Sequence, residues 1–285
     1  QIISGGVGSD GKLVVVGTPK GEVLAFDASN GRELWKARVS SEVLAAPAIA
    51  DGLVVVRSGD ARIFGFDAMD GKRRWVYQRS TPALALRTSV GVLLAGKFTL
   101  AGFPGGKLVA IANNNGAAVW EVTVALPKGS TELERVADVT SIPAVSGSTI
   151  CAAAFQGRIA CFESNSGNTL WSRDMSSSVG VDMDSRYVYV SDDKGAIHAL
   201  DLASGASIWK QDKLTHRQLS APAARGRFVA VGDVKGVIHV LNRDDGSFAA
   251  RLTTDGSPVT APIQVQDSRF VVQTRNGALL GLEVR

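Results

Sequence analysis

The sequence has no long apolar run. None of its hydrophobic stretches reaches the roughly 18 uninterrupted apolar residues that a membrane-spanning helix needs. Even the apolar stretch 90–96 is ended by Lys97. We therefore expect no transmembrane helix in these 285 residues. With 45% hydrophobic and 20% charged residues, the chain still has enough apolar side chains for an ordinary core.

Histidine and cysteine are scarce, with three and two residues respectively, and no group of them has the spacing of a metal site. We expect neither a metal ion nor any other cofactor. His198 and His239 occupy equivalent positions in successive copies of a repeat, which gives both a structural explanation. His216 has no carboxylate or nucleophile beside it in the sequence that would indicate catalysis.

The two cysteines, Cys151 and Cys161, lie on two predicted strands that flank a turn at Gln156 and Gly157. The favoured interpretation is that both are small buried hydrophobic residues. A cross-strand disulfide, formed in an oxidising compartment, is the alternative. It requires the two strands to pair in the right register.

A large charge excess is also missing, since the formal net charge is +4. The excess is concentrated between Arg57 and Arg87, where seven basic residues accompany three acidic ones. Such a patch attracts acidic partners and raises association rates. Alternatively, Lys72, Arg73 and Arg74 only keep a turn and an outer strand solvated. No aromatic residues alternate with the basic ones, so nucleic acid is not an expected partner.

What the sequence does contain is a repeat that places all five tryptophans at the same position. In each copy a turn ends in glycine and a tryptophan follows it, and successive tryptophans are 40, 45, 51 and 38 residues apart. A sixth copy has Ala250 instead, and a seventh ends before its turn. Repeats of about 40 residues indicate one supersecondary unit stacked on copies of itself. The residues predicted to pack between neighbouring units are Trp35, Trp75, Trp120, Trp171 and Trp209.

A single copy of the repeat consists of short β-type runs separated by turns, with no helical period. Residues 12–39 contain three such runs, at 13–17, 22–26 and 33–37. A further short strand that contains proline precedes several copies, at 44–48, 141–145, 219–223 and 260–263. Four antiparallel strands per copy make a β-propeller blade. We therefore predict an all-β chain that forms a single β-propeller domain over residues 1–285, with six full units and a partial last unit.

Two segments depart from the repeat, and such departures are where repeat proteins most often insert function. In residues 83–88 the expected proline-containing strand is replaced by two leucines and an arginine, Leu84, Leu86 and Arg87. Strand alternation would put both leucines on one face, as an exposed apolar pair beside a cation. The alternative is that both leucines belong to the core.

The second departure is a polar loop at residues 125–139, about ten residues longer than its counterparts. Its Leu133, Val136 and Val139 favour a short docked segment over a flexible linker. Both irregular segments precede a unit at comparable points of successive units. We therefore expect them to emerge side by side on one face and to form a mixed patch, in which Arg87 lies near Asp138 or a nearby glutamate, Glu132 or Glu134.

These segments also carry a likeness to a known family. The chain resembles the BamB family, the outer-membrane lipoproteins of the bacterial β-barrel assembly machinery, along essentially its whole length. The most specific motifs are residues 84–87, 129–139 and 214–222. The glycine–tryptophan repeat alone is shared by many propellers with pyrroloquinoline-quinone-type repeats.

The resemblance implies a non-enzymatic scaffold at the periplasmic face of the outer membrane. It would bind the POTRA domains of the barrel subunit BamA, associate with other subunits and help outer-membrane proteins fold and insert. Unfolded outer-membrane proteins are a further implied partner. In the family, two leucines and an arginine of the first motif and two aspartates of the second form the BamA-binding face. The matching positions are Leu84, Leu86, Arg87 and Asp138, with Arg135 in the second motif and Thr140 in place of the second aspartate.

The same resemblance bears on the N-terminus. Family members have eight blades, whereas six full units and one partial unit are visible here. Residues 1–6 also resemble the middle of a strand more than a chain start. We expect an N-terminal part with a lipid anchor, the eighth blade and the closing strand to precede residue 1, so that the anchor is the only contact with the membrane.

Two other functions fit the repeat. A quinoprotein dehydrogenase would be about twice as long, with a vicinal cysteine pair and a cluster of carboxylates for calcium. The sequence has no vicinal cysteine pair and no convergent acid cluster. A periplasmic propeller that binds a small ligand or a peptide in its central channel is the other alternative. Reduction of an artificial acceptor tests the first, and co-purification with the barrel subunit separates the second from a scaffold.

Overall fold

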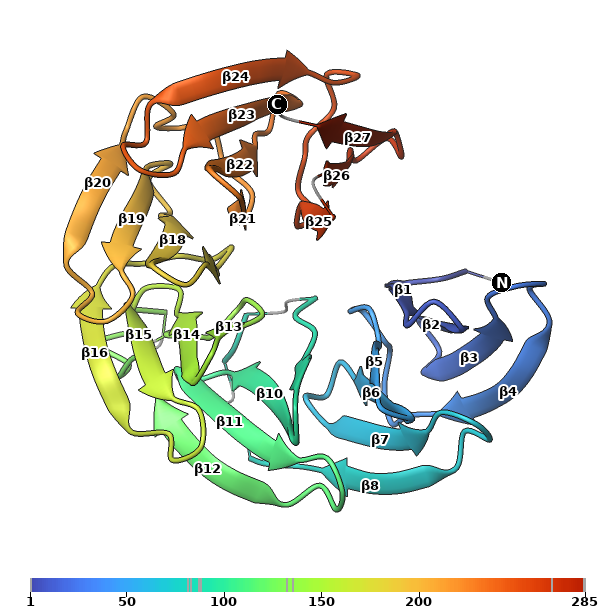
Figure 1. Cartoon of the computed structure of the whole chain (residues 1–285). Coiled ribbons are helices and arrows are strands. Elements are labelled where there is room, and N and C mark those ends of the chain that lie inside the picture. The colour runs from blue at the N-terminus through green and yellow to red at the C-terminus, as the bar shows by residue number, and fades with distance from the viewer. Residues whose placement is uncertain are drawn as a thin grey trace. The chain divides into compact units, whose positions relative to one another are not determined.

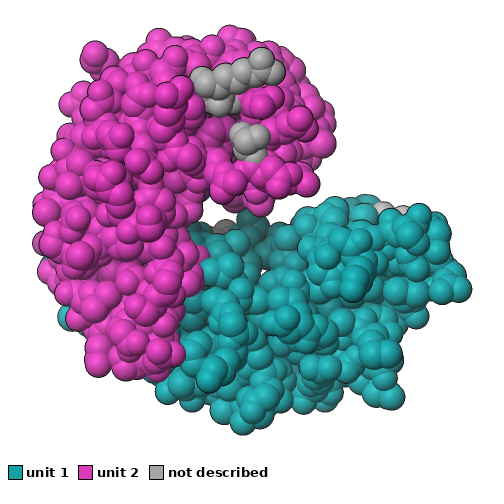
Figure 2. Space-filling model, in the orientation of Figure 1, with its two compact units in different colours: residues 1–142 teal, residues 143–285 magenta. Residues whose placement is uncertain are grey.

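A computed structural model describes residues 2–80, 82, 84–86, 89–131, 133–134, 136–267 and 269–283. Every regular element in these ranges is a β-strand, which confirms the all-β prediction. Within the same ranges, no helix has the length and apolar character needed to cross a membrane. The chain divides into two compact units, residues 1–142 and 143–285, which Figure 2 colours separately.

The first unit contains three four-stranded antiparallel sheets in its described residues. In each sheet the strands lie side by side in chain order, as Figure 1 shows. The strands are β1 (Gly5–Ser9), β2 (Leu13–Gly17), β3 (Glu22–Asp27) and β4 (Glu33–Arg38) in sheet 1; β5 (Ala48–Ala50), β6 (Leu53–Arg57), β7 (Ile63–Asp67) and β8 (Arg73–Tyr77) in sheet 2; and β9 (Leu93–Ala95), β10 (Phe98–Phe103), β11 (Lys107–Ala112) and β12 (Ala118–Thr123) in sheet 3.

The second unit follows the same plan, with three four-stranded sheets and a final three-stranded one in its described residues. The strands are β13 (Ala144–Ser146), β14 (Thr149–Ala153), β15 (Arg158–Glu163) and β16 (Thr169–Asp174) in sheet 4; β17 (Val181–Met183), β18 (Tyr187–Ser191), β19 (Ile197–Asp201) and β20 (Ser207–Gln211) in sheet 5; β21 (Ala223–Arg225), β22 (Phe228–Gly232), β23 (Val237–Asn242) and β24 (Phe248–Thr253) in sheet 6; and β25 (Gln264–Gln266), β26 (Arg269–Gln273) and β27 (Leu279–Glu283) in sheet 7.

The turn between the third and fourth strands forms as the sequence predicts. In sheet 1 the Gly31 amide donates to the Asp27 carbonyl at 2.8 Å, and the Ser29 amide donates to the Asp27 carboxylate at 2.8 Å. Gly31 has a φ of +73°, a value that glycine adopts without steric cost. The Asp–Gly turn therefore specifies a tight antiparallel hairpin.

The first strands of sheets 2 and 4 begin slightly later in the sequence than predicted. We predicted strands at 44–48 and 141–145, but β5 begins at Ala48, directly after Pro47, and β13 begins at Ala144, directly after Pro143. Proline has no amide hydrogen to donate to a strand ladder, so pairing starts only after it. Each of these two prolines therefore directly precedes the first strand of its sheet and does not belong to that strand.

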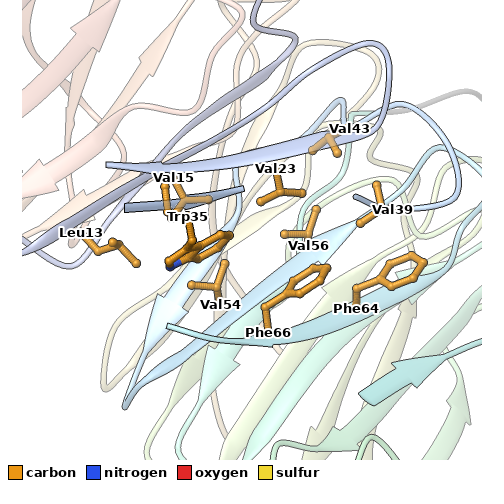
Figure 3. Close-up of a cluster of buried hydrophobic side chains, with 11 residues drawn as sticks. Leu13, Val15, Val23, Trp35, Val39, Val43, Val54, Val56, Phe64 and Phe66 are labelled. Carbon is orange, nitrogen blue, oxygen red and sulfur yellow. The ribbon is translucent and has the colours of Figure 1, made fainter. Parts of the chain in front are cut away.

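Four of the five tryptophans pack between consecutive sheets of their own unit, as predicted. Trp35 is buried among aliphatic and aromatic side chains of sheets 1 and 2, including Val15, Val54 and Phe66 (Figure 3). Its indole nitrogen donates to the Ala68 carbonyl of the next sheet at 2.9 Å. The other tryptophans that bond a carbonyl of the following sheet in the same unit are Trp75 (Asn113, 2.8 Å), Trp171 (Leu202, 2.8 Å) and Trp209 (Arg243, 2.7 Å), and Trp120 is likewise buried.

The turn glycine of the following sheet completes this packing. A Cβ added to Gly71 would lie 2.6 Å from the Trp35 ring, and one added to Gly205 would lie 2.5 Å from the Trp171 ring. The glycine that shapes one turn therefore also leaves room for the tryptophan of the preceding sheet. This shared requirement explains why the two residue types repeat together.

The favoured interpretation of the two cysteines was wrong. Cys151 and Cys161 face each other directly across β14 and β15, and they form a disulfide. Both are fully buried, so they do occupy the core as predicted, but as a bonded pair. The sequence alone does not give the register that places one cysteine opposite the other.

Removal of this disulfide is expected to destabilise the protein. A cross-link that closes a loop of this length restricts the unfolded chain, and its loss costs about 3 kcal/mol in the chain-entropy estimate. The Cys151→Ala, Cys161→Ala double variant should therefore unfold at lower denaturant concentration. A thiol assay of the unfolded wild-type protein should detect free thiols only after reduction. Reactive thiols without reductant would contradict the pairing.

Candidate docking surface

The two irregular segments leave equivalent ends of successive sheets. β8 ends at Tyr77, which pairs with Ile63 at the start of β7. β12 ends at Thr123, which pairs with Lys107 at the start of β11. The segments that follow β8 and β12 therefore both start beside the turn between the second and third strands of their sheet. Because sheets 2 and 3 pack against each other, the two segments emerge on the same side of the first unit.

A buried carboxylate joins these segments. Asp138 is only 3% exposed, and its two oxygens accept hydrogen bonds from the Leu86 amide at 2.7 Å and from the Gly105 amide at 3.0 Å. Gly105 lies in the turn between β10 and β11, so one side chain ties the first segment to sheet 3. The prediction that the segments lie side by side is confirmed.

Leu84 and Leu86 are exposed, with 46% and 39% of their surface accessible. They lie outside regular strands, so strand alternation does not explain their exposure. Val90, a few residues further on, is buried. We call Leu84 and Leu86 the docking surface; Asp138 bonds the backbone amide of Leu86.

The remaining predicted site residues differ in what the structure says about them. Arg87, Arg135 and Glu132 lie outside the described residues, so the predicted approach of Arg87 to Asp138 is not tested. Thr140 is half-buried beside Asp138. Asp138 itself is buried and engaged by backbone amides, which makes it a support for the docking surface more than part of its outer face.

The long loop is partly docked, as predicted. Val136 and Val139 are buried, and the Val139 amide donates to the Phe103 carbonyl at 3.3 Å. The prediction for Leu133 was wrong, because this side chain is 71% exposed. It lies in a turn closed by Glu134, whose carboxylate accepts the amides of residues 130 and 131, and the pKa of Glu134 is lowered by these backbone hydrogen bonds. The turn presents Leu133 outward.

We expect Asp138→Asn to loosen the docking surface. An amide group has one acceptor oxygen where the carboxylate has two, so either the Leu86 or the Gly105 amide would face a donor. An unsatisfied buried donor costs about 1–3 kcal/mol. Thermal unfolding should show this loss, and hydrogen exchange at the Leu86 amide should accelerate. Asp51→Asn, at an exposed turn of the same unit, is the matched control and should change neither.

In the described part of the basic stretch, Lys72 and Arg74 lie apart from Arg57. Lys72 and Arg74 pair with Asp70 and Asp67 of their own hairpin turn, at 2.8 Å and 2.6 Å. That turn lies at one end of β7, whereas Arg57 pairs with Ile63 at the opposite end. For Lys72 and Arg74, the structure therefore supports the simpler interpretation of a solvated turn.

The two repeated histidines have structural partners, as their repeat position indicates. The imidazole Nε2 atoms of His198 and His239 each lie 2.9 Å from an aspartate that begins the preceding turn, Asp192 and Asp233 respectively. Burial lowers the pKa of His239, which favours its neutral form. No group of three or more potential metal-ligating side chains occurs within the described part of the chain.

Sequence reasoning missed a cavity beside the docking surface. It has a volume of about 410 Å³, and Leu86 and Asp138 form part of its wall. Arg57 also lines it, whereas in the sequence this residue stands out only as the start of the basic stretch. The signal was available in the repeat. The position of Arg57 is occupied in five other sheets by a small residue: Gly17, Gly102, Ala153, Ser191 and Gly232.

Comparisons with known proteins agree with the fold and with the sequence motifs. The family model described as outer membrane protein assembly factor BamB matches residues 1–211. The Bordetella pertussis protein of that name is 46% identical over 279 residues, which cover 98% of this chain and 72% of the relative. The crystal structure of BamB from Moraxella catarrhalis superposes with a TM-score of 0.91 at 31% identity and covers 98% of this chain and 84% of that one.

A europium-containing methanol dehydrogenase is also similar, with a TM-score of 0.70 at 12% identity, covering 96% of this chain and 71% of that one. At this identity the likeness shows the fold alone, a propeller architecture that enzymes share. The extensive matches to assembly factors are of a different kind, because they combine sequence identity with the same fold over nearly the whole chain. The chain is a β-propeller protein that belongs to the BamB family of outer membrane protein assembly factors.

Proposed function

We propose that this protein is a non-enzymatic scaffold subunit that binds the POTRA domains of the barrel subunit BamA through its docking surface. In this role it assists the folding and insertion of outer-membrane proteins. The observation that carries the proposal is the exposure of Leu84 and Leu86 on a segment that a buried carboxylate holds in place. Two exposed leucines close together on a segment that breaks the repeat are consistent with a surface that a partner covers.

The geometry suits a protein partner. Burying an exposed leucine releases about 1 kcal/mol or more, and the two leucines together provide the apolar centre of a small interface. The Asp138 carboxylate bonds the Leu86 amide before binding, which lowers the ordering entropy that this residue loses on association. Arg87 follows Leu86 directly in the sequence, and we propose that it supplies a cation to the same interaction.

We place the chain in the periplasm at the outer membrane, as part of the assembly complex and anchored by a lipid outside these 285 residues. The Cys151–Cys161 disulfide supports an oxidising compartment. The two compact units together would act as one propeller domain. Contacts with other subunits and with unfolded outer-membrane proteins belong to the same proposal.

Calorimetric titration with the soluble POTRA region of BamA tests the proposal. The wild-type chain should bind, and the Leu84→Glu, Leu86→Glu double variant should bind at least about 30-fold more weakly, since two charges would be buried without partners. Leu34→Glu is a matched control, because Leu34 is 42% exposed on β4, away from this segment. It should bind like the wild type.

Two results would count against the proposal. One is an absence of binding by the folded wild-type chain. The other is equal weakening by the double variant and by Leu34→Glu, which would mean that any added charge disturbs the interaction and that the docking surface has no special part in it.

A further inference from the structure

The cavity next to the docking surface has an unusual charge distribution. In the part of the chain that the structure describes, three charged side chains line it: Arg57, Asp60 and Asp138. Both carboxylates are engaged. Asp138 accepts two backbone amides, whereas Asp60 accepts the Ser58 hydroxyl and lies 3.6 Å from Arg62. Among the described contacts, neither carboxylate forms an ion pair with Arg57.

Among the described residues, Arg57 lines the cavity and forms no ion pair. Within the described residues, no carboxylate oxygen lies within ion-pair distance of its guanidinium. One of its nitrogens donates to the Gly102 carbonyl at 2.6 Å, and its guanidinium carbon lies 4.9 Å from the centre of the Phe103 ring. Burial lowers the pKa of Arg57 to about 10, which leaves it cationic at neutral pH. The Arg57 guanidinium has further N–H groups that can donate hydrogen bonds to a ligand.

Comparison of the repeats shows that Arg57 is a charged residue at a position where five other sheets have a small one. In sheets 1, 3 and 6 the equivalent glycine makes room for a valine from the outgoing loop. A Cβ on Gly17 would lie 2.2 Å from Val43, and one on Gly102 would lie 2.4 Å from Val139. In sheet 2 the long side chain of Arg57 occupies this position, and the space that it borders is the cavity.

Leu86 connects the cavity to the docking surface, because its side chain is both a wall of the cavity and 39% exposed. A group that enters the cavity would therefore come from a molecule that already covers Leu86. Leu44 and Val90 supply apolar walls, which weaken competition by water for the guanidinium.

We propose that this cavity is a recognition pocket for an aspartate or glutamate side chain of the protein bound on the docking surface, with Arg57 as its counter-ion. This inference rests on the proposed function, since the docked partner supplies the acid. The guanidinium is held in advance by the Gly102 carbonyl and the Phe103 ring, so its free donors can bond a carboxylate in a paired geometry.

The test uses the full chain and the soluble POTRA region of BamA. Arg57→Met keeps most of the side-chain volume against Phe103 and removes the charge. It is expected to bind about 30-fold more weakly than the wild type, which corresponds to about 2 kcal/mol at 25 °C. Arg57→Lys keeps the charge and should recover part of this loss. Thermal unfolding establishes that both variants are folded.

The acidic partner is identified by replacing each aspartate or glutamate of the POTRA region with its amide. One such replacement should weaken binding to the wild type and have no further effect with Arg57→Met. The pocket proposal is overturned if both folded Arg57 variants bind like the wild type, if Arg57→Lys binds no better than Arg57→Met, or if no acidic residue is coupled to Arg57. Failure of the docking proposal is distinguishable, because there the wild-type chain itself does not bind.

Discussion

Replacing Trp171 with alanine is expected to lower the free energy of unfolding by about 3–5 kcal/mol, the usual cost of removing a large buried aromatic side chain. Trp171 packs in the core shared by sheets 4 and 5, and its indole nitrogen donates to the Leu202 carbonyl of sheet 5 at 2.8 Å. The substitution would open a cavity between the two sheets and leave that carbonyl without its donor. Denaturant unfolding measures the loss.

The neighbouring residue provides the control. Leu170 precedes Trp171 on β16 and is 48% exposed, so Leu170→Ala should change the unfolding free energy by no more than about 0.5 kcal/mol. If Trp171→Ala were equally neutral, the tryptophan would not hold the two sheets together, and the explanation of the repeat would be wrong.

A charge reversal at Arg87 is expected to have the largest effect on partner binding. Arg87 follows Leu84 and Leu86 in the motif shared with the BamB family, and it ends the net-basic stretch. In Arg87→Glu an acidic partner group would face a like charge, which costs at least about 2–5 kcal/mol in a desolvated contact. Binding to the POTRA region should therefore fall below detection in a pull-down, while the melting temperature stays unchanged.

Arg73→Glu is the matched reversal, since Arg73 is exposed in the same basic stretch but belongs to β8. It should retain binding. Loss of binding by both variants would indicate long-range attraction between net charges, and retention of binding by folded Arg87→Glu would remove Arg87 from the interface.

The fold could be predicted from the sequence because the same pair of residues, a turn glycine and a following tryptophan, recurs in every full repeat but one. A turn glycine and the following tryptophan are local signals, and their repetition predicts the hairpins and the packing of one sheet on the next. The structure adds that the glycine also accommodates the preceding tryptophan, as Gly205 does for Trp171. Strand boundaries were less certain, because a proline such as Pro143 only limits where pairing can begin.

The candidate site was predicted in part, for a physical reason. Leu84 and Leu86 stand out because they break the repeat, and a break is visible in one sequence. The role of Asp138 was not visible, because it depends on backbone amides 52 and 33 residues away, at Leu86 and Gly105. A side chain that bonds distant backbone carries no local signature.

Arg57 is an intermediate case. When the repeats are aligned on the tryptophan, Arg57 stands out because the other repeats mostly have a small residue there. When only charges are counted, Arg57 is one of seven basic residues in a stretch. The disulfide was only the alternative interpretation for a similar reason, since pairing of Cys151 with Cys161 depends on strand register. Arg57 and the two cysteines are noticeable in the sequence, but their roles become clear only from the residues that they contact.

Site-specific photo-crosslinking tests the central claim most directly. A photoreactive amino acid placed at Leu84, at Leu86 or, as a control, at Leu34 would be irradiated with the POTRA region of BamA present. The docking surface predicts covalent products with that region from positions 84 and 86 and none from position 34. Equal products from all three positions, or products from position 34 alone, would contradict the assignment of Leu84 and Leu86 as the surface on which the partner binds.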